Sequence, residues 1–445
     1  MPKITHRKKR LSSFKLIVLG FAGVIVLGAL ILMLPFSSTA GVVTPFHEAL
    51  FTSTSAVCVT GLVVQDTGSY WSAFGQTVIL LLIQIGGLGV VTVAALFAML
   101  SGRKISLMQR STMQDAISAP KVGGIVRLTR FIVRGTFLIE LIGMIVMLPT
   151  FCGNYGFKGI WMAAFHSVSA FCNAGFDILG TAENKYPSLT GYIGNPAINI
   201  AIMLLIIVGG IGFLTWDDIY TNKWHFKKYR MQSKVILVTT AILIIAPAVF
   251  FFFCDFTGLP LAERILASLF QSVTPRTAGF NTADLPDMTG SSKAIMTLLM
   301  LVGGSPGSTA GGMKTTTLAV LILSAFSVCR KKDDAEVCGR RIDGSTVKNA
   351  AAVAVMYFLL FFVGGIVIST AEGLPLSTCL YETASAVGTV GLTLGITPQL
   401  GVLSQLILIV LMYLGRVGGL TLIYAAISNK NQSGAKLPLE KITVG

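Results

Sequence analysis

Four short stretches, each ending in glycine, carry the residue types that could bind a dehydrated cation. Each follows a segment rich in small and hydroxyl-bearing residues, and the final glycines lie 114, 104 and 112 positions apart. Backbone carbonyls can replace the water around an ion when such a stretch points them at a pore axis, and glycine permits the backbone angles that this requires. The predicted filter stretches are Val57, Cys58, Val59, Thr60, Gly61; Phe171, Cys172, Asn173, Ala174, Gly175; Pro275, Arg276, Thr277, Ala278, Gly279; and Val387, Gly388, Thr389, Val390, Gly391.

A fifth segment, rich in glycine, could place a polar obstruction next to these stretches. Five Gly and one Pro in ten positions cannot sustain a helix, although the segment interrupts an otherwise apolar run. We therefore predict a loop inside the membrane that acts as a gate, the alternative being a passive kink. The predicted gate comprises Gly303, Gly304, Ser305, Pro306, Gly307, Ser308, Thr309, Ala310, Gly311 and Gly312, together with Lys314 and Arg416.

Two features of the predicted gate bear on its chemistry. Arg416 lies in an apolar segment, where a cation is costly unless it faces water or carbonyl groups, so we expect it to face the pore and to pair with the loop. The run from Gly307 to Gly312 approaches the phosphate-binding pattern G-x-x-x-x-G-K-[ST], but Met313 breaks the spacing before Lys314. The segment also follows a helix rather than a strand, and we exclude ATP binding there.

Acidic residues lie near three of the filter stretches. Asp66, Asp177 and Asp284 could raise the local cation concentration at a pore mouth, although ordinary loop acids are an equal alternative. Glu382 lies at membrane depth, where ionisable residues are functional candidates, and a tether for its own filter stretch is the alternative. Glu140 lies in a long helix outside the predicted pore.

Catalytic and metal chemistry have no comparable pattern. The four His and seven Cys residues are scattered, no two Cys form a C-x-x-C pair, and no Ser/His/Asp arrangement stands out. We predict that the chain is not an enzyme and that it has no cofactor of its own.

The composition predicts that all these residues are positioned by membrane helices. The chain has 445 residues, of which 53% are hydrophobic and 12% charged, and its mean hydropathy is +0.77. Soluble domains carry roughly 25% charged residues, so this chain needs the bilayer as its solvent. We expect one pore-forming membrane domain over 1–445.

Each filter stretch falls at the same place in a repeated pattern. A spanning helix (M1) precedes a short re-entrant helix (P), and a second spanning helix (M2) follows the filter stretch, which predicts an all-α protein with eight spans and four pore helices around a pseudo-four-fold pore. The expected repeats are 14–100, 125–219, 235–328 and 347–427. Within them, M1 is expected at 14–34, 125–148, 235–253 and 347–370; P at 46–56, 160–170, 262–273 and 376–386; and M2 at 73–100, 196–219, 292–328 and 401–427.

The distribution of charge predicts the orientation in the cell membrane. Of the 34 Lys and Arg residues, 27 lie in the N-terminal segment 1–13, the connectors between repeats, the adjoining helix ends and the tail 428–445. This bias predicts that both termini are cytoplasmic. It also explains the net charge of +15 without nucleic-acid binding, which we exclude, and leaves a docking surface for a cytosolic protein as one use of the basic connectors.

These motifs together resemble the Trk/Ktr/HKT superfamily of potassium ion transporters, and most closely its KtrB-type membrane subunits. The resemblance covers nearly the whole chain and rests on the four Gly-ended stretches, the interrupted third M2 and the sequence LGRVGG around Arg416. It implies that Gly61, Gly175, Gly279 and Gly391 mark a potassium-selective filter. It also implies that residues 303–312 correspond to the family's intramembrane loop and that Arg416 corresponds to its arginine near the filter.

The resemblance implies partners as well. It predicts a homodimer with one pore in each protomer, surrounded by membrane lipid and seated on a cytosolic ring of KtrA-like regulatory subunits of the RCK fold. ATP or ADP would bind that ring and not this chain, and potassium would be the substrate held at the filter carbonyls.

Two mechanisms of transport remain open from the sequence. The leading hypothesis is a channel-like pore for potassium uptake, with activation by sodium undecided. The alternative is a sodium- or proton-coupled potassium symporter, which normally needs a carboxylate embedded in the membrane. Apart from Glu140 and Glu382, such acids are scarce here.

Overall fold

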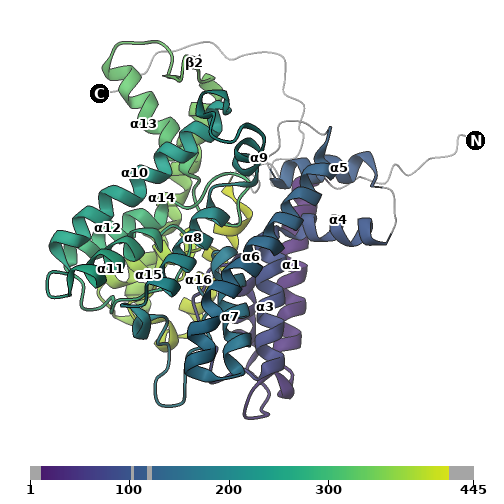
Figure 1. The fold of residues 1–445 in the computed structure, drawn as a ribbon, viewed down its shortest axis with the longest axis vertical. Helices are drawn as coiled ribbons and strands as arrows, with labels where there is room; N and C mark the ends of the chain where they lie inside the picture. The colour runs from purple at the N-terminus through teal and green to yellow at the C-terminus, as the bar shows by residue number, and fades with distance from the viewer. Residues whose placement is uncertain (1–11, 102–104, 118–122, 420–445) are drawn as a thin grey trace, which may run out of the picture.

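Four long apolar helices organise the fold. The structure, a computed structural model, describes residues 12–101, 105–117 and 123–419 and is mostly helical (Figure 1). Each of the four is long and apolar enough to cross a membrane, which requires about 20 residues. They are α1 (Ser13–Leu32), α6 (Ile125–Tyr155), α10 (Met231–Cys254) and α14 (Gly344–Glu372).

A short helix follows each long helix and is attached to it in the same way. The short helices are α2 (Phe46–Cys58), α7 (Lys158–Phe171), α11 (Leu261–Val273) and α15 (Leu376–Gly388). In each, a buried Ser or Thr hydroxyl donates to a backbone carbonyl of the preceding long helix, which fixes the angle between the two. The pairs are Ser53–Ile25 (2.7 Å), Ser167–Glu140 (2.5 Å), Ser272–Ile244 and Thr383–Phe361 (3.0 Å).

The apolar segments after the short helices are less regular than expected. The helices predicted over 73–100 and 196–219 are each broken into two, α3 (Ala73–Leu88) with α4 (Val90–Leu100) and α8 (Pro196–Gly210) with α9 (Phe213–Asn222), bent by 96° and 98°. At each break a glycine, Gly89 or Gly212, adopts a positive φ of 85° or 92°, which ends the helix.

The third and fourth of these segments are shorter still. α12 (Gly290–Leu301) and α13 (Thr315–Cys329) are separated by the Gly-rich loop, as the sequence predicts, and α16 (Val402–Val417) is the last helix. Residues 420–427 of the fourth expected repeat, the tail 428–445 and most of the N-terminal segment lie outside the described residues.

The remaining elements are small and lie in the connections. α5 (Leu107–Ile117) packs against α1 and α4, and a two-stranded antiparallel hairpin follows α13. The other elements are η1 (Pro35–Ser37), η2 (Thr190–Tyr192), η3 (Phe226–Lys228), β1 (Glu336–Val337), β2 (Arg340–Arg341) and η4 (Thr397–Gln399).

Contacts between the four groups of helices close into a circle. α3 contacts α7, α8 contacts α11, α12 contacts α15, and α16 contacts α2. The helix after each short helix therefore packs on the short helix of the next group, and the last group packs on the first. This arrangement brings the ends of the four short helices to one central place.

Candidate functional site

The ends of three short helices turn the chain sharply toward this centre. At the end of α2, the Val59 N–H donates to the Ala56 carbonyl (3.2 Å) and the Thr60 N–H to the Ser55 carbonyl (2.8 Å), which is the Schellman pattern of helix termination. α7 and α15 end with the same pair of bonds, whereas α11 ends in a run of turns.

This termination corrects the expected extent of the extended stretches. Five extended residues were predicted in each, but Val57 and Cys58 are the last residues of α2, Phe171 the last of α7, and Val387 and Gly388 the last of α15. The buried packing of Val57, Cys58 and Val387 and the close approach of Gly388 to the Met300 carbonyl keep these residues helical, two residues beyond the expected ends of α2 and α15. Outside the helices lie the last three residues of the first and fourth stretches, the last four of the second and all five of the third.

A shared backbone geometry marks the same two positions in all four stretches. The final glycines have φ values of 93°, 68°, 81° and 96°, and the residues two positions earlier, Val59, Asn173, Thr277 and Thr389, have φ values between 53° and 69°. A positive φ in a β-branched residue such as Val or Thr is uncommon and costs about 1–3 kcal/mol. Strain at Val59, Thr277 and Thr389, at the position that Asn173 occupies in the second stretch, points to a requirement on the direction of the backbone carbonyls.

The four glycines lie against one another in a closed ring. A methyl group on Gly61 would overlap the Ala174 carbonyl; on Gly175, that of Ala278; on Gly279, that of Val390; and on Gly391, that of Thr60. Each glycine thus abuts the residue before the next glycine in chain order, and the last abuts the first. The backbones approach so closely that no side chain fits, and we call Gly61, Gly175, Gly279 and Gly391 the glycine ring.

Two serine hydroxyls support the glycine ring, and two threonine hydroxyls near it have no hydrogen-bond partner among the described residues. Ser55 and Ser385 accept the N–H groups of Gly61 (3.0 Å) and Gly391 (2.9 Å). The buried Thr60 and Thr389 hydroxyls have no hydrogen-bond partner among the described residues. Buried polar groups are nearly always satisfied, so these two oxygens are candidates for contact with water or a cation.

The second and third stretches are linked by side chains instead. The Asn173 amide donates to the Arg276 carbonyl (3.2 Å) and to the Thr277 hydroxyl (3.3 Å). The Arg276 side chain turns away from the ring and donates to the Thr240 hydroxyl in α10 (3.2 Å). Arg276 therefore contributes only its backbone to the site.

A cavity of about 260 Å³ opens on one side of the ring, and we call it the outer mouth. All four ring glycines line it, together with Asp66 and Asp177 but not Asp284. The Asp66 carboxylate is occupied by the backbone N–H groups of Ser69 (2.8 Å) and Tyr186 (3.0 Å). The pKa of Asp177 is raised to about 7, chiefly by burial; the hydrogen bond from the Leu179 N–H acts to lower it, and the nearby Asp66 carboxylate acts to raise it.

The Gly-rich loop crosses the opposite side of the ring. Its Thr309 hydroxyl donates to the Phe171 carbonyl at the end of α7 (3.1 Å). On the far side, its Gly311 and Gly312 pack so tightly against Thr389 and the Gly388 carbonyl that side chains there would collide. The loop therefore spans from the second to the fourth stretch, directly beneath the ring.

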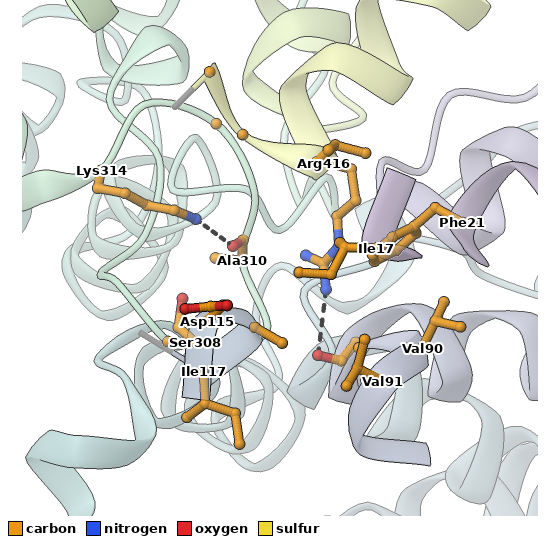
Figure 2. A pocket seen from close by; sticks show the side chains of 18 of the residues that line it. Ile17, Phe21, Val90, Val91, Asp115, Ile117, Ser308, Ala310, Lys314 and Arg416 are labelled. Atoms are coloured by element: carbon orange, nitrogen blue, oxygen red, sulfur yellow. Dashed lines mark hydrogen bonds between the residues drawn. The ribbon is translucent and has the colours of Figure 1, made fainter. Parts of the chain in front are cut away.

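Two cations hold the loop in this position. Arg416 donates to the carbonyls of Thr309 in the loop and of Gly86 and Gly87 (3.2 Å) in α3, and Lys314 donates to those of Ala310 (2.9 Å) and Gly311 (3.3 Å). Figure 2 shows both side chains at a cavity of about 230 Å³ beneath the loop, with Lys314 pointing to Ala310. The structure thus brings together every predicted gate residue.

Glu382 and Glu140 sit behind filter stretches rather than on the ring. Glu382 accepts the hydroxyls of Thr393 (2.9 Å) and Thr397, which ties the chain after the fourth glycine back to its own short helix. Glu140 is buried, accepts from the Gln84 amide (3.4 Å) and lies 4.0 Å from the Cys172 sulfur. Gln84 is not among the predicted site residues, although a polar residue within an apolar helix is a usable signal.

The chain matches a known protein family over most of its length. The profile of the TrkH family, described as "Cation transport protein", matches residues 13–434. A solved structure, the crystal structure of the potassium transporter TrkH from Vibrio parahaemolyticus, superposes with a TM-score of 0.74 at 19% identity, covering 96% of this chain and 87% of that one. That likeness concerns the fold.

Two curated proteins are similar over nearly their whole length. The potassium/sodium uptake protein NtpJ of Enterococcus hirae is 39% identical over 450 residues, covering 98% of each chain. The Ktr system potassium uptake protein B of Bacillus subtilis is 37% identical over 439 residues, covering 97% of this chain and 96% of the relative.

Proposed function

We propose that this chain, which belongs to the TrkH family of cation transport proteins, takes up potassium across the cell membrane through the glycine ring. Members of this family are ion transporters and not enzymes. The observation that carries the proposal is the closed ring of contacts, in which each glycine lies against the carbonyl of the residue before the next ring glycine. Carbonyls arranged around an axis can replace the hydration shell of a potassium ion. The uptake functions named for the two curated relatives agree with this substrate.

We propose four M1-P-M2 repeats around this axis. In this scheme α1, α6, α10 and α14 are the M1 helices, the four short helices are the pore helices, and the segments after the filter stretches are the M2 helices, one of them interrupted by the loop. The circular contacts support the scheme. The excess of Lys and Arg in the connectors supports cytoplasmic termini.

The Gly-rich loop would be the gate of this pore. Its contacts with Phe171 and Thr389 of two filter stretches support this role, and so do the hydrogen bonds that Arg416 of α16 donates to both the loop and α3. A cation at this point also repels a permeating cation. Opening would require the loop to leave Phe171 and Thr389, while the ring itself stays in place.

The test of the function is ion flux into proteoliposomes that contain this chain alone. We expect potassium to enter down its own gradient without sodium, and more readily than sodium does. Flux that requires sodium and moves it in a fixed ratio would contradict a passive pore. Absence of potassium flux from folded protein, including the loop-deleted variant described in the Discussion, would contradict the proposal.

A coupled symporter is the second candidate, and Glu140 is the observation that favours it. Its carboxyl group is buried at membrane depth and lies 4.0 Å from Cys172 in a filter stretch. Such groups often serve as proton or sodium sites. If coupling passes through Glu140, Glu140→Gln will abolish sodium- or proton-driven accumulation, whereas passive potassium exchange will persist.

The outer mouth predicts a dependence of uptake on external pH. Because the pKa of Asp177 is raised to about 7, its carboxyl group is charged above pH 7 and becomes neutral as the pH falls below it. The negative charge attracts cations, so we expect uptake to fall severalfold between external pH 8 and pH 6. Rates measured in Asp177→Asn should be low and nearly independent of pH over this range; an unchanged pH profile would contradict the assignment.

We further propose the assembly that the sequence resemblance implies. The chain would form a homodimer on a cytosolic KtrA-like ring of the RCK fold, with ATP or ADP bound by the ring. The basic connectors are suited to an acidic partner surface, and a relative is named as part of a Ktr system. Co-purification of the ring subunit with this chain, and a nucleotide effect on flux that appears only when the ring is present, would test this.

A further inference from the structure

The Asn173 side chain lies where three parts of the site meet. It is fully buried and contacts the third filter stretch, the Gly-rich loop and the end of α8. Its backbone is left-handed, with a φ of 60°, and asparagine adopts this conformation more readily than most residues. Val59, Thr277 and Thr389 occupy the same position in the other stretches. Of these four side chains, only that of Asn173 can donate and accept hydrogen bonds at separate atoms.

The amide nitrogen of Asn173 uses both of its hydrogens on the third stretch. It donates to the Arg276 carbonyl (3.2 Å) and to the Thr277 hydroxyl (3.3 Å), and we call these two bonds the amide bridge. Asn173 directly precedes Ala174, and Thr277 directly precedes Ala278. The carbonyls of Ala174 and Ala278 are two of the four that meet the glycine ring. The amide bridge therefore joins the second and third stretches one residue before these carbonyls.

The other two sides of the ring are held in a different way. The first and fourth ring glycines each donate their N–H to a serine hydroxyl. Among the described residues, no side chain accepts from the N–H of Gly175 or Gly279. The corresponding hydroxyl of the second stretch, that of Ser169, donates to the Phe176 carbonyl (2.8 Å) instead. The amide bridge is thus the side-chain link between the second and third sides of the ring.

The amide oxygen of Asn173 faces the Gly-rich loop. The buried Thr309 hydroxyl shares its hydrogen between this oxygen (3.3 Å) and the Phe171 carbonyl (3.1 Å). The Thr309 N–H donates to the Gly209 carbonyl at the end of α8 (3.2 Å). A Cβ on Gly209 would lie 2.9 Å from the Asn173 amide oxygen, so the glycine makes room for this contact. The loop is therefore docked at one end of the amide, and the third stretch is held at the other.

We propose that Asn173 is a positioning residue that holds two sides of the ring through its amide nitrogen and the closed loop through its amide oxygen. The inference rests on the proposed function of the ring and adds a residue that determines its selectivity. The ion preference of a carbonyl filter depends on how its carbonyls are arranged around the ion. Because the two contacts use opposite ends of the amide, the loop can leave the oxygen while the amide bridge stays intact.

The experiment measures potassium and sodium flux into proteoliposomes that contain the full chain or one of its variants. Thr277→Val removes one acceptor of the amide bridge but keeps the β-branched shape, and Val59 already occupies this position in the first stretch with a φ of 57°. The preference for potassium over sodium should fall about threefold or more, with no rise in potassium flux. Thr309→Val should instead raise potassium flux about threefold or more, with the preference unchanged. Asn173→Ala should produce both effects.

A double variant and a matched control separate this role from a general loss of packing. In N173A/T277V the preference should equal that of N173A alone, because the amide bridge is already absent. Thr52→Val makes the same chemical change at a buried hydroxyl of α2 that has no hydrogen-bond partner among the described residues. It should change neither the flux nor the preference.

Three results would overturn the inference: an unchanged preference in T277V, an equal loss in T52V, or additive losses in the double variant. Failure of the proposed function is recognised separately. If the unsubstituted chain passes no potassium, the proposed function fails and this inference fails with it. If that chain is selective and T277V is equally selective, only the role of the amide bridge is lost.

Discussion

Potassium flux is expected to fall by at least tenfold when Gly391 is replaced by Ala. A methyl group there would overlap the Thr60 carbonyl and lie 3.0 Å from the Cα of Gly61, so two neighbouring sides of the ring must separate. An increase of only 1.36 kcal/mol in the barrier to permeation slows a rate tenfold. Because the ring widens irregularly, the preference for potassium over sodium should fall as well. Flux of both ions from proteoliposomes measures the two effects.

Gly395 provides a matched control for this substitution. It lies four residues further along, has a similar φ of 91° against 96°, and has open space where a Cβ would be built. Both Ala substitutions carry the cost of a side chain at positive φ, about 1–2 kcal/mol. Only Gly391→Ala should change flux and selectivity. Equal effects of the two variants would mean that backbone strain, and not the ring contact, is responsible.

Deleting Gly304–Gly311 is expected to raise potassium flux at least tenfold. The deletion removes the segment beneath the ring, including the carbonyl of Thr309 that Arg416 contacts. The chain can close over the gap because Gly303 lies against Gly312, whose Cα is 3.2 Å from the position of a Cβ on Gly303. Removing an obstruction that adds about 1.4 kcal/mol to the barrier accounts for a tenfold rise.

Arg416→Gln is a milder change than the deletion and tests the same role of the loop. It removes the guanidinium contacts to the loop and to α3 but leaves the loop itself, so flux should rise by less than in the deletion. In both variants the selectivity for potassium should be unchanged, because neither alters the glycine ring. Unchanged or lower flux after the deletion, in protein with a normal unfolding transition, would remove the loop from the role of gate.

The long helices were predictable from hydrophobic runs, because a span of about 20 apolar residues has few other solutions. The helix predicted over 235–253 is observed as α10 over 231–254, and the helix predicted over 347–370 is observed as α14 over 344–372. The largest error was the end of α6, expected at 148 and found at Tyr155. Pro149 signals a break in sequence, yet it lies inside the helix, where a proline is tolerated in membrane helices.

The sequence alone does not distinguish the glycines that bend a helix, Gly89 and Gly212, from glycines that allow two helices to pack closely. Glycines within membrane helices usually permit close approach of a neighbour, and Gly86 and Gly209 do that, lying against the carbonyls of Val57 and Phe171. A few residues later, Gly89 ends its helix instead. Only the tertiary contacts decide which glycine packs and which one bends.

In the filter stretches too, tertiary contacts decide the conformation of single residues that the sequence does not predict. The spacing of Gly61 and its counterparts was visible in the sequence, but the left-handed backbone of Val59 contradicts the local preference of a β-branched residue. Such a conformation persists only where the surroundings impose it. The approach of Glu140 to Cys172 is also invisible in sequence, because it depends on the packing of α6 against α7.

Because all four ring glycines belong to one polypeptide, each side of the ring can be mutated separately. Where a comparable ring is assembled from four identical subunits, any codon change alters all four sides together. Here each side has its own codon, so Gly61, Gly175, Gly279 and Gly391 can be substituted singly or in pairs. Double-mutant cycles between adjacent and opposite sides would measure how cooperatively the four sides hold one ion.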